Sequence, residues 1–78
     1  MKIQVMGPGC YRCQTTYNLI ERVIRENKLE VQLEKVSDMT TMISMGILST
    51  PAVVIDGKVV VSGRVPRADE ITQWIQSS

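Results

Sequence analysis

The 78-residue chain contains no histidine, and its only two cysteines are Cys10 and Cys13. A closed zinc site needs four ligands. A metal would therefore require carboxylates or a second chain, or would be a soft two-coordinate ion such as Cu(I). The sequence also lacks the run of about 20 apolar residues that a transmembrane helix needs. Its formal net charge of +1 gives no electrostatic reason to bind nucleic acid or an anionic membrane.

Internal repeats, low-complexity segments and linkers are also missing from the sequence. A chain of this length buries only roughly 60% of the surface that it exposes when unfolded, so we expect a single domain over residues 1–78. The first five residues are typical of a strand and not of a secretory signal, which predicts a cytoplasmic protein. In the cytosol a purely structural disulfide is uncommon.

Hydrophobic periodicity and turn residues predict four strands and three helices. Strands are expected at residues 2–6, 29–34, 52–55 and 58–62, and helices at 11–27, 39–46 and from Pro66 onward. The first strand–helix–strand unit must be a parallel, right-handed crossover. Asp56-Gly57 predicts a hairpin between the last two strands. The expected fold is therefore α/β, with the order β-α-β-α-β-β-α and a four-stranded mixed sheet flanked by three helices.

Apolar spacing also identifies the faces that should form the core. The expected core positions are Tyr17, Ile20, Val23 and Ile24 in the first helix and Ile71, Trp74 and Ile75 in the last. Asp38 is expected to cap the short helix at its N-terminus. The methionines of that helix, Met39, Met42 and Met45, either fill the core or form a pliable apolar patch for varied protein partners.

The two cysteines lie in the motif Cys10-Tyr11-Arg12-Cys13, after the Gly7-Pro8-Gly9 turn and before the first predicted helix. Two intervening residues in a helical turn bring two sulfur atoms within bonding reach. The helix N-terminus stabilises a thiolate and lowers its pKa. We therefore predict that Cys10 is the nucleophile and that Cys13 is the buried resolving thiol. A structural disulfide would close only a four-residue loop and would contribute roughly 2 kcal/mol or less.

These residues, together with Ser49-Thr50-Pro51 directly before the predicted hairpin, resemble the thioredoxin superfamily over nearly the whole chain. The Gly7-Pro8-Gly9-Cys10 segment and the size are most similar to small thioredoxin-like, or redox-active disulfide, proteins. Glutaredoxins are the next most similar group. The resemblance implies a cis peptide bond at Thr50–Pro51 facing the dithiol. It also implies that the Thr50 backbone pairs with an extended substrate and that Pro51 shields the sulfurs from a metal.

The sequence departs from the family at several positions. Tyr11-Arg12 replaces the Gly-Pro of thioredoxins and the Pro-Tyr of glutaredoxins, and Gly9 replaces the tryptophan that precedes the motif. No acidic residue occurs where thioredoxins keep a buried carboxylate. Arg64 and Arg67 follow a Ser-Gly pair where glutaredoxins often have Gly-Gly, and we expect them to be solvated rather than to bind glutathione.

The sequence thus predicts an enzyme, a thioredoxin- or glutaredoxin-like thiol–disulfide oxidoreductase that reduces protein disulfides through a mixed disulfide. The predicted site comprises catalytic Cys10 and Cys13 and substrate-binding Thr50, Pro51, Tyr11, Arg12 and Gly9. No metal or organic cofactor is expected, the electron donor would be a thioredoxin-reductase-like protein or glutathione, and the protein would be a monomer. The alternatives are non-enzymatic binding of a metal or metalloid by the two thiolates and a degenerate fold that serves only as an interaction module.

Overall fold

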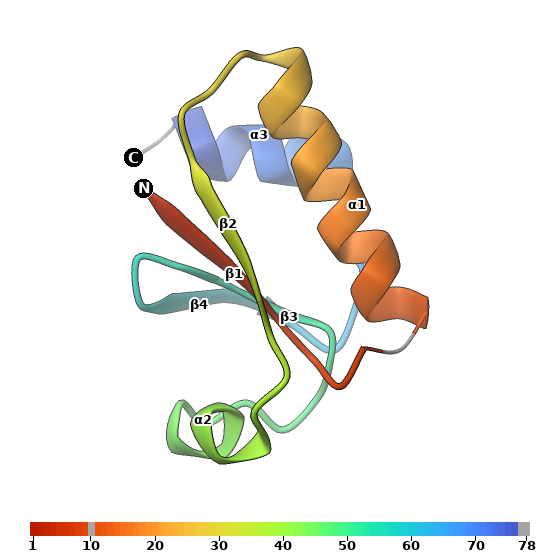
Figure 1. Cartoon of the computed structure of the whole chain (residues 1–78), viewed down its shortest axis with the longest axis vertical. Coiled ribbons are helices and arrows are strands. Elements are labelled where there is room, and N and C mark those ends of the chain that lie inside the picture. The colour runs from red at the N-terminus through yellow and green to blue at the C-terminus, as the bar shows by residue number, and fades with distance from the viewer. Residues whose placement is uncertain (10, 77–78) are drawn as a thin grey trace.

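The computed structural model describes residues 1–9 and 11–76, and it contains the seven expected elements in the expected order (Figure 1). These are β1 (Lys2–Met6), α1 (Tyr11–Glu26), β2 (Gln32–Val36), α2 (Met39–Ser44), β3 (Ala52–Ile55), β4 (Lys58–Ser62) and α3 (Ala68–Gln76). The four strands form one sheet in the order β2-β1-β3-β4. β1 pairs in parallel with β2 and antiparallel with β3, and β3 pairs antiparallel with β4. The predicted α/β fold with a mixed sheet is therefore confirmed.

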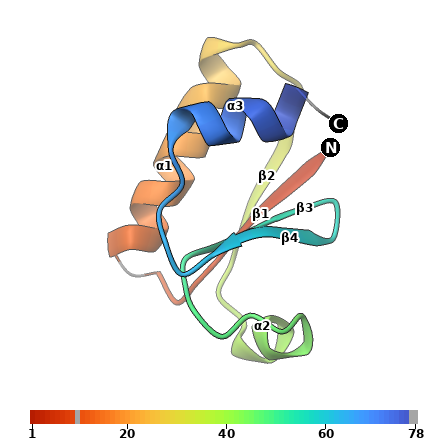
Figure 2. The ribbon, with the colours of Figure 1, turned by 180° about the vertical axis from the view of Figure 1, so that it is seen from behind.

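The larger core lies between the sheet and the two long helices. α1 and α3 lie together on one face of the sheet, as both views along the shortest axis show (Figures 1 and 2). Alternate strand residues point to the same face, so every second position of the strands meets these helices. The buried residues of this cluster include Ile3, Val5, Val53, Ile55, Ile20, Val23, Ile71 and Ile75.

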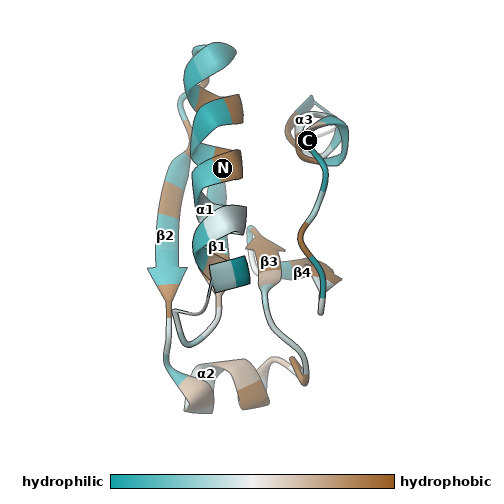
Figure 3. Ribbon diagram, turned by 90° about the vertical axis from the view of Figure 1, so that its right-hand side faces the viewer, coloured by the Kyte–Doolittle hydropathy of each residue, from teal (hydrophilic) through white to brown (hydrophobic). Residues whose placement is uncertain are grey.

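A smaller core lies on the opposite face and involves α2. The intervening strand positions, Met6, Ala52 and Val54, pack there with Met42 of α2 and with Ile47. Hydropathy follows this division (Figure 3): the apolar residues of α1 lie on the side turned toward α3, and α2 is mostly pale to brown. Of the helices in residues 1–9 and 11–76, none is long and apolar enough to cross a membrane.

The second strand differs from its predicted bounds, since it runs from Gln32 to Val36 and not over residues 29–34. The Leu29 N–H donates to the Ile24 carbonyl at 3.0 Å, so this part of the alternating segment closes the C-terminus of α1 instead of pairing with β1. Lys28, at that helix end, has the left-handed conformation, with a φ of 52°. β2 lies at one edge of the sheet.

A carboxylate accepts hydrogen bonds at the N-terminus of α2 and at that of α3. The Asp38 side chain accepts hydrogen bonds from the Thr40 N–H at 3.1 Å and the Thr41 hydroxyl at 2.8 Å, which confirms the predicted cap of α2. α3 begins at Ala68 and not at Pro66, because Glu70 accepts a hydrogen bond from the Arg67 N–H at 3.0 Å and so fixes the first turn there. Pro66 is buried ahead of the helix.

The core predictions for the last helix are confirmed, and those for the methionines hold only in part. Met42 alone of the three methionines is buried, since Met39 is 58% exposed and Met45, just after α2, is partly buried. Trp74 is partly buried and packs against the larger core with Ile71 and Ile75, as predicted. The hairpin prediction is confirmed: Asp56 and Gly57 both have positive φ, at 49° and 84°.

Candidate functional site

The first turn of α1 carries the candidate site. Cys10 lies outside the described residues. Cys13 is buried because it begins the stripe of helix positions that face the sheet, which continues through Thr16 and Ile20. Arg12 is exposed, and Tyr11 is 86% exposed, so the Tyr11 ring lies in solvent and does not pack over Cys13.

Gly7 provides the space that the Cys13 sulfur occupies. A Cβ atom on Gly7 would overlap the Sγ atom of Cys13, and it would lie 3.2 Å from the Cys13 Cβ and 3.6 Å from the Thr50 Cβ. Gly7 is itself fixed, because its N–H donates to the Val36 carbonyl at 2.9 Å. The Cys13 and Thr50 side chains therefore both lie against Gly7, just after the end of β1.

The segment that precedes β3 forms the other side of this contact. The Thr50–Pro51 peptide bond is cis. Pro51 is buried, and its carbonyl accepts a hydrogen bond from the Gly63 N–H at 2.9 Å. The structure thus brings Thr50 and Cys13 together through Gly7. Gly9 lies at the edge of the same site, with a φ of 88° and no atom within 4 Å of the position that a Cβ would take.

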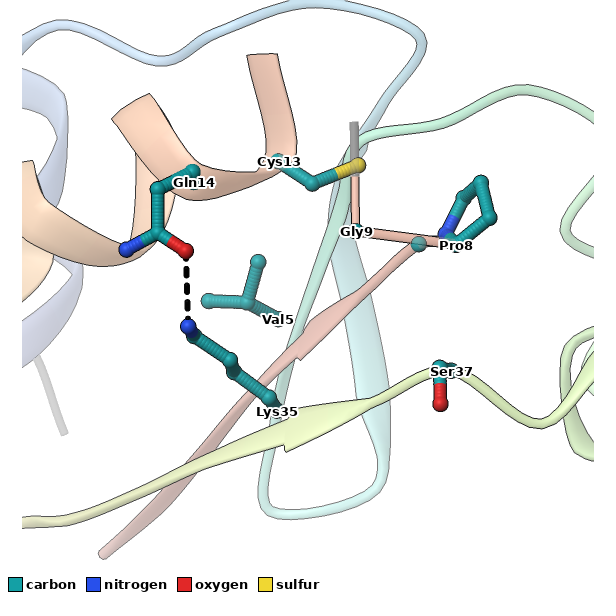
Figure 4. Close-up of a pocket in the computed structure, with 8 residues that line it drawn as sticks. Val5, Pro8, Gly9, Cys13, Gln14, Lys35 and Ser37 are labelled. Carbon is teal, nitrogen blue, oxygen red and sulfur yellow. Dashed lines mark hydrogen bonds between the residues drawn. The ribbon is translucent and has the colours of Figure 1, made fainter. Parts of the chain in front are cut away.

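A pocket of about 260 Å³ opens beside the Cys13 sulfur (Figure 4). Its described lining residues are Val5, Gly7, Pro8, Gly9, Cys13, Gln14, Lys35 and Ser37. Val5 and Lys35 are register partners in the parallel pair of β1 and β2, so their side chains point to the same face, toward α1. Lys35 consequently reaches Gln14 on α1, and its Nζ atom donates to the Gln14 Oε1 atom at 2.7 Å.

The sequence alone does not identify Lys35, Gln14 and Ser37 as site residues, nor the contact of Gly7 with Cys13. Lys35 falls beyond the predicted end of its strand. Lys35 can be placed beside the first turn of α1 only when its register with Val5 is known. In the sequence, Gly7 is notable only as part of the turn before Cys10.

Arg64 and Arg67, the two arginines considered as glutathione ligands, are held by α3 instead. Arg64 donates two hydrogen bonds to the Glu70 carboxylate, at 2.8 and 2.6 Å. These bonds, followed by the hydrogen bond from the Arg67 N–H, lower the pKa of Glu70 to about 2. Both guanidinium groups also form ion pairs with acidic residues of α3.

The described residues offer no ready metal site. Within residues 1–9 and 11–76, no group of three or more His, Cys, Asp or Glu residues is arranged so that it could hold a metal ion.

The chain can be compared with known families by three features: the element order, the buried Cys13 and the adjoining Thr50–Pro51 segment. A model of the thioredoxin domain matches residues 1–76. The chain belongs to the thioredoxin family. A thioredoxin of Methanothermobacter thermautotrophicus is 31% identical over 71 residues, covering 91% of this chain and 92% of that protein. A thioredoxin of Methanocaldococcus jannaschii is 29% identical over 75 residues, covering 96% and 86% respectively.

Membership of the thioredoxin family supports a function of the thiol–disulfide oxidoreductase type. In general terms the family also implies protein substrates and a reductase as partner.

Proposed function

We propose that this protein reduces protein disulfides, with Cys10 as the nucleophile and Cys13 as the resolving thiol. The observation that carries the proposal is the position of Cys13, whose side chain is 5% exposed and contacts the backbone of Gly7. A sulfur so enclosed is poorly accessible to an external disulfide. It is suited instead to attack a neighbouring sulfur of the same chain, and residue 10 precedes it by three positions.

The reaction proceeds by two exchanges. The Cys10 thiolate attacks one sulfur of the substrate disulfide, the substrate S–S bond breaks, and the departing thiolate takes up a proton. Cys13 then loses its proton and attacks the Cys10 sulfur of the mixed disulfide. The second substrate thiolate leaves, and a Cys10–Cys13 bond forms. Two electrons pass from the protein dithiol to the substrate, and an external donor restores the dithiol.

We assign substrate positioning to Thr50 and Pro51, because Thr50 adjoins the Gly7 backbone that contacts Cys13. Gly9, ahead of α1, and Tyr11 and Arg12, in its first turn, are exposed and are available to a bound polypeptide. The cycle as written needs no metal or organic cofactor. The proposed donor is a thioredoxin-reductase-like protein or glutathione, and the proposed setting is a cytoplasmic monomer.

Trapping experiments test the assignment of the two cysteines. Cys13→Ser should accumulate a mixed disulfide between Cys10 and a protein disulfide such as insulin, because the resolving step is lost. Cys10→Ser should form no such adduct and should not reduce insulin. The adduct is measured by intact-mass spectrometry without reductant. Turnover by the wild type is compared with a thioredoxin-reductase system and with a glutathione system, which identifies the donor.

The opposite result would favour the binding alternative. If Cys13→Ser traps nothing, while the wild type binds Cu(I) or As(III) tightly and reduces no insulin, the two thiolates serve as ligands and the oxidoreductase proposal is wrong.

A further inference from the structure

The pocket beside Cys13 is lined by one positively charged residue and, among the described residues, by no negatively charged one. Among the described residues that line it, only Lys35 is ionised, and the others are glycine, proline, valine, cysteine, serine and glutamine. Figure 4 shows Lys35 extending from β2 to Gln14 on α1, with Val5 between these side chains and the Cys13 sulfur. The ammonium group of Lys35 and the sulfur of Cys13 therefore border the same small volume.

Lys35 is exposed, yet contacts hold its side chain in place. Its Nζ atom donates to Gln14 Oε1 at 2.7 Å and lies 4.6 Å from the centroid of the Tyr17 ring. The Gln14 Nε2 atom donates to Asn18 Oδ1 at 2.9 Å, which directs the Gln14 oxygen toward Lys35. These contacts restrict the Lys35 side chain before a ligand binds, which lowers the entropy lost on binding and favours selective recognition.

The charge of Lys35 has no acidic partner in the described structure. Lys2 pairs with Glu34 at 3.0 Å and Arg64 with Glu70 at 2.6 Å. Lys35, by contrast, takes part in none of the ion pairs found in residues 1–9 and 11–76, and both groups that hold it are neutral. An ammonium group has three N–H donors, and Gln14 uses one of them. An anion entering the pocket could accept from the rest.

The size of the pocket limits what such an anion can be. Its volume of about 260 Å³ falls below the roughly 300–1,000 Å³ of sites for drug-sized ligands. A short carbon chain that ends in a carboxylate fits this volume. Val5 and Pro8 would contact its methylene groups, and Lys35 would bind the carboxylate.

We propose that the pocket is an anion-selective subsite for one arm of a small organic disulfide whose arms end in carboxylates. This inference rests on the proposed function. The dithiol and the disulfide RSSR give the Cys10–Cys13 disulfide and two RSH molecules. Two electrons and two protons pass from the protein to the two arms, one S–S bond breaks and another forms. The Lys35 ammonium group binds the carboxylate of one arm, while Cys13 completes the exchange.

A simpler role for Lys35 makes a different prediction. If its charge only stabilised the Cys13 thiolate, removing that charge would slow every substrate by the same factor. A subsite instead changes the order of preference among substrates. The decisive quantity is thus the ratio of rates between disulfides of similar size and different charge.

The experiment uses the pre-reduced full chain in single-turnover reactions, so that no electron donor is needed. The probes are the disulfides of 3-mercaptopropionate (anionic), 2-mercaptoethanol (neutral) and cysteamine (cationic). Each rate is divided by the rate for dithiothreitol, which removes differences in intrinsic reactivity. The wild type should prefer the anionic over the neutral disulfide by about tenfold, as one charge-assisted hydrogen bond allows, and should react most slowly with the cationic one.

Variants of Lys35 then test the residue itself. Lys35→Met should reduce the anionic-to-neutral ratio to about one, and Lys35→Arg should retain most of the preference because the charge remains. Lys58→Met, which removes a lysine from β4 that does not line the pocket, is the matched control and should keep the wild-type ratio. Thermal unfolding of each variant confirms that it is folded.

An anionic-to-neutral ratio near one in the wild type, or equal slowing of all three substrates by Lys35→Met, would overturn the subsite while leaving the proposed function intact. If the wild type reduces neither insulin nor any of the three disulfides, the proposed function is wrong and the subsite with it.

Discussion

The two faces of the sheet support the candidate site unequally. On one face, α1 and α3 cover a continuous core that includes Ile3, Ile20 and Ile71, each fully buried. On the other, the six-residue α2 contributes a single buried side chain, Met42. Large apolar side chains remain exposed on or just after α2: Met39 at 58%, Ile43 at 66% and Leu48 at 92%.

This difference assigns different physical properties to the two parts of the site. Cys13 belongs to the well-covered face, through a 16-residue helix. Thr50 and Pro51 follow α2, and Ile47 and Ala52 on either side of them belong to the smaller core. Local opening requires less free energy where fewer apolar contacts are lost. We therefore expect the thiol side of the site to be rigid and the substrate side to adjust to different partners.

The largest expected effect on stability comes from substitutions that leave a cavity in one core or the other. Ile20→Ala should reduce the free energy of unfolding by about 2–5 kcal/mol, the usual range for such a cavity, and should increase hydrogen exchange in every element. Met42→Ala removes a similar volume. It should accelerate exchange mainly in α2 and the segment before β3, with less change in β1 and α1. Hydrogen exchange measured by mass spectrometry distinguishes the two patterns.

Ile43→Ala is the control for this pair, since the side chain is mostly exposed and its removal should change stability by less than about 0.5 kcal/mol. The comparison of the two faces fails if Met42→Ala and Ile20→Ala accelerate exchange equally throughout the chain, because the sheet and all helices would then open as one unit.

A smaller effect is expected where the two faces meet, at Gly7. In Gly7→Ala the new methyl group must displace the Cys13 sulfur, so we expect a loss of about 1–3 kcal/mol of stability, typical of overpacking. We also expect slower resolution of the mixed disulfide. Single-turnover reduction of insulin, followed by quenched mass spectrometry, measures that step. Its slowing should exceed what the loss of stability alone would cause.

Gly57→Ala provides the matched comparison. Gly57 has a φ of 84° and no atom within 4 Å of the position that a Cβ would take, so alanine there introduces backbone strain without a steric overlap, at about 1 kcal/mol. It should leave resolution unchanged. Equal resolution rates in Gly7→Ala and the wild type would show that the contact between Gly7 and Cys13 has no part in the exchange.

The same contrast between local and long-range features explains what the sequence could predict. The bounds of β1, β3 and β4 follow from β-branched runs, glycine breaks and the Asp56-Gly57 turn, all of which act within a few residues. The burial of Cys13 was likewise expected from its place behind Cys10 in the first turn of the predicted helix. These parts of the fold were predicted correctly because local patterns determine them.

The remaining features depend on contacts between distant segments. The alternation from Leu29 to Glu34 gave no sign that the Leu29 N–H would close α1 at Ile24. The place of Lys35 in the pocket depends on its register with Val5. Gly7 acquires its role only when Cys13 and Thr50 are brought to the same point. A pattern within one segment carries no information about such pairings.

The smallest effect is expected at the edge of the well-covered face, where Glu70 holds the start of α3. Its pKa is lowered to about 2 by the hydrogen bonds from Arg64 and then by that from the Arg67 N–H. A carboxyl group whose pKa is lower in the folded state stabilises the fold above its unfolded-state pKa, and this contribution is lost as the pH falls through the folded-state value. The wild type should therefore lose stability from Glu70 between about pH 5 and pH 2. Glu70→Gln should be less stable than the wild type at pH 7 and should approach it toward pH 2.

Thermal unfolding midpoints from pH 2 to pH 7 measure this convergence, with Glu26→Gln as a control, since Glu26 forms none of the ion pairs found in the described part of the chain. High salt should reduce the difference at pH 7, because the Arg64 and Glu70 side chains are partly exposed. Parallel pH profiles for Glu70→Gln and the wild type would mean that the carboxylate does not stabilise α3. The advantage of this face would then rest on its apolar core alone.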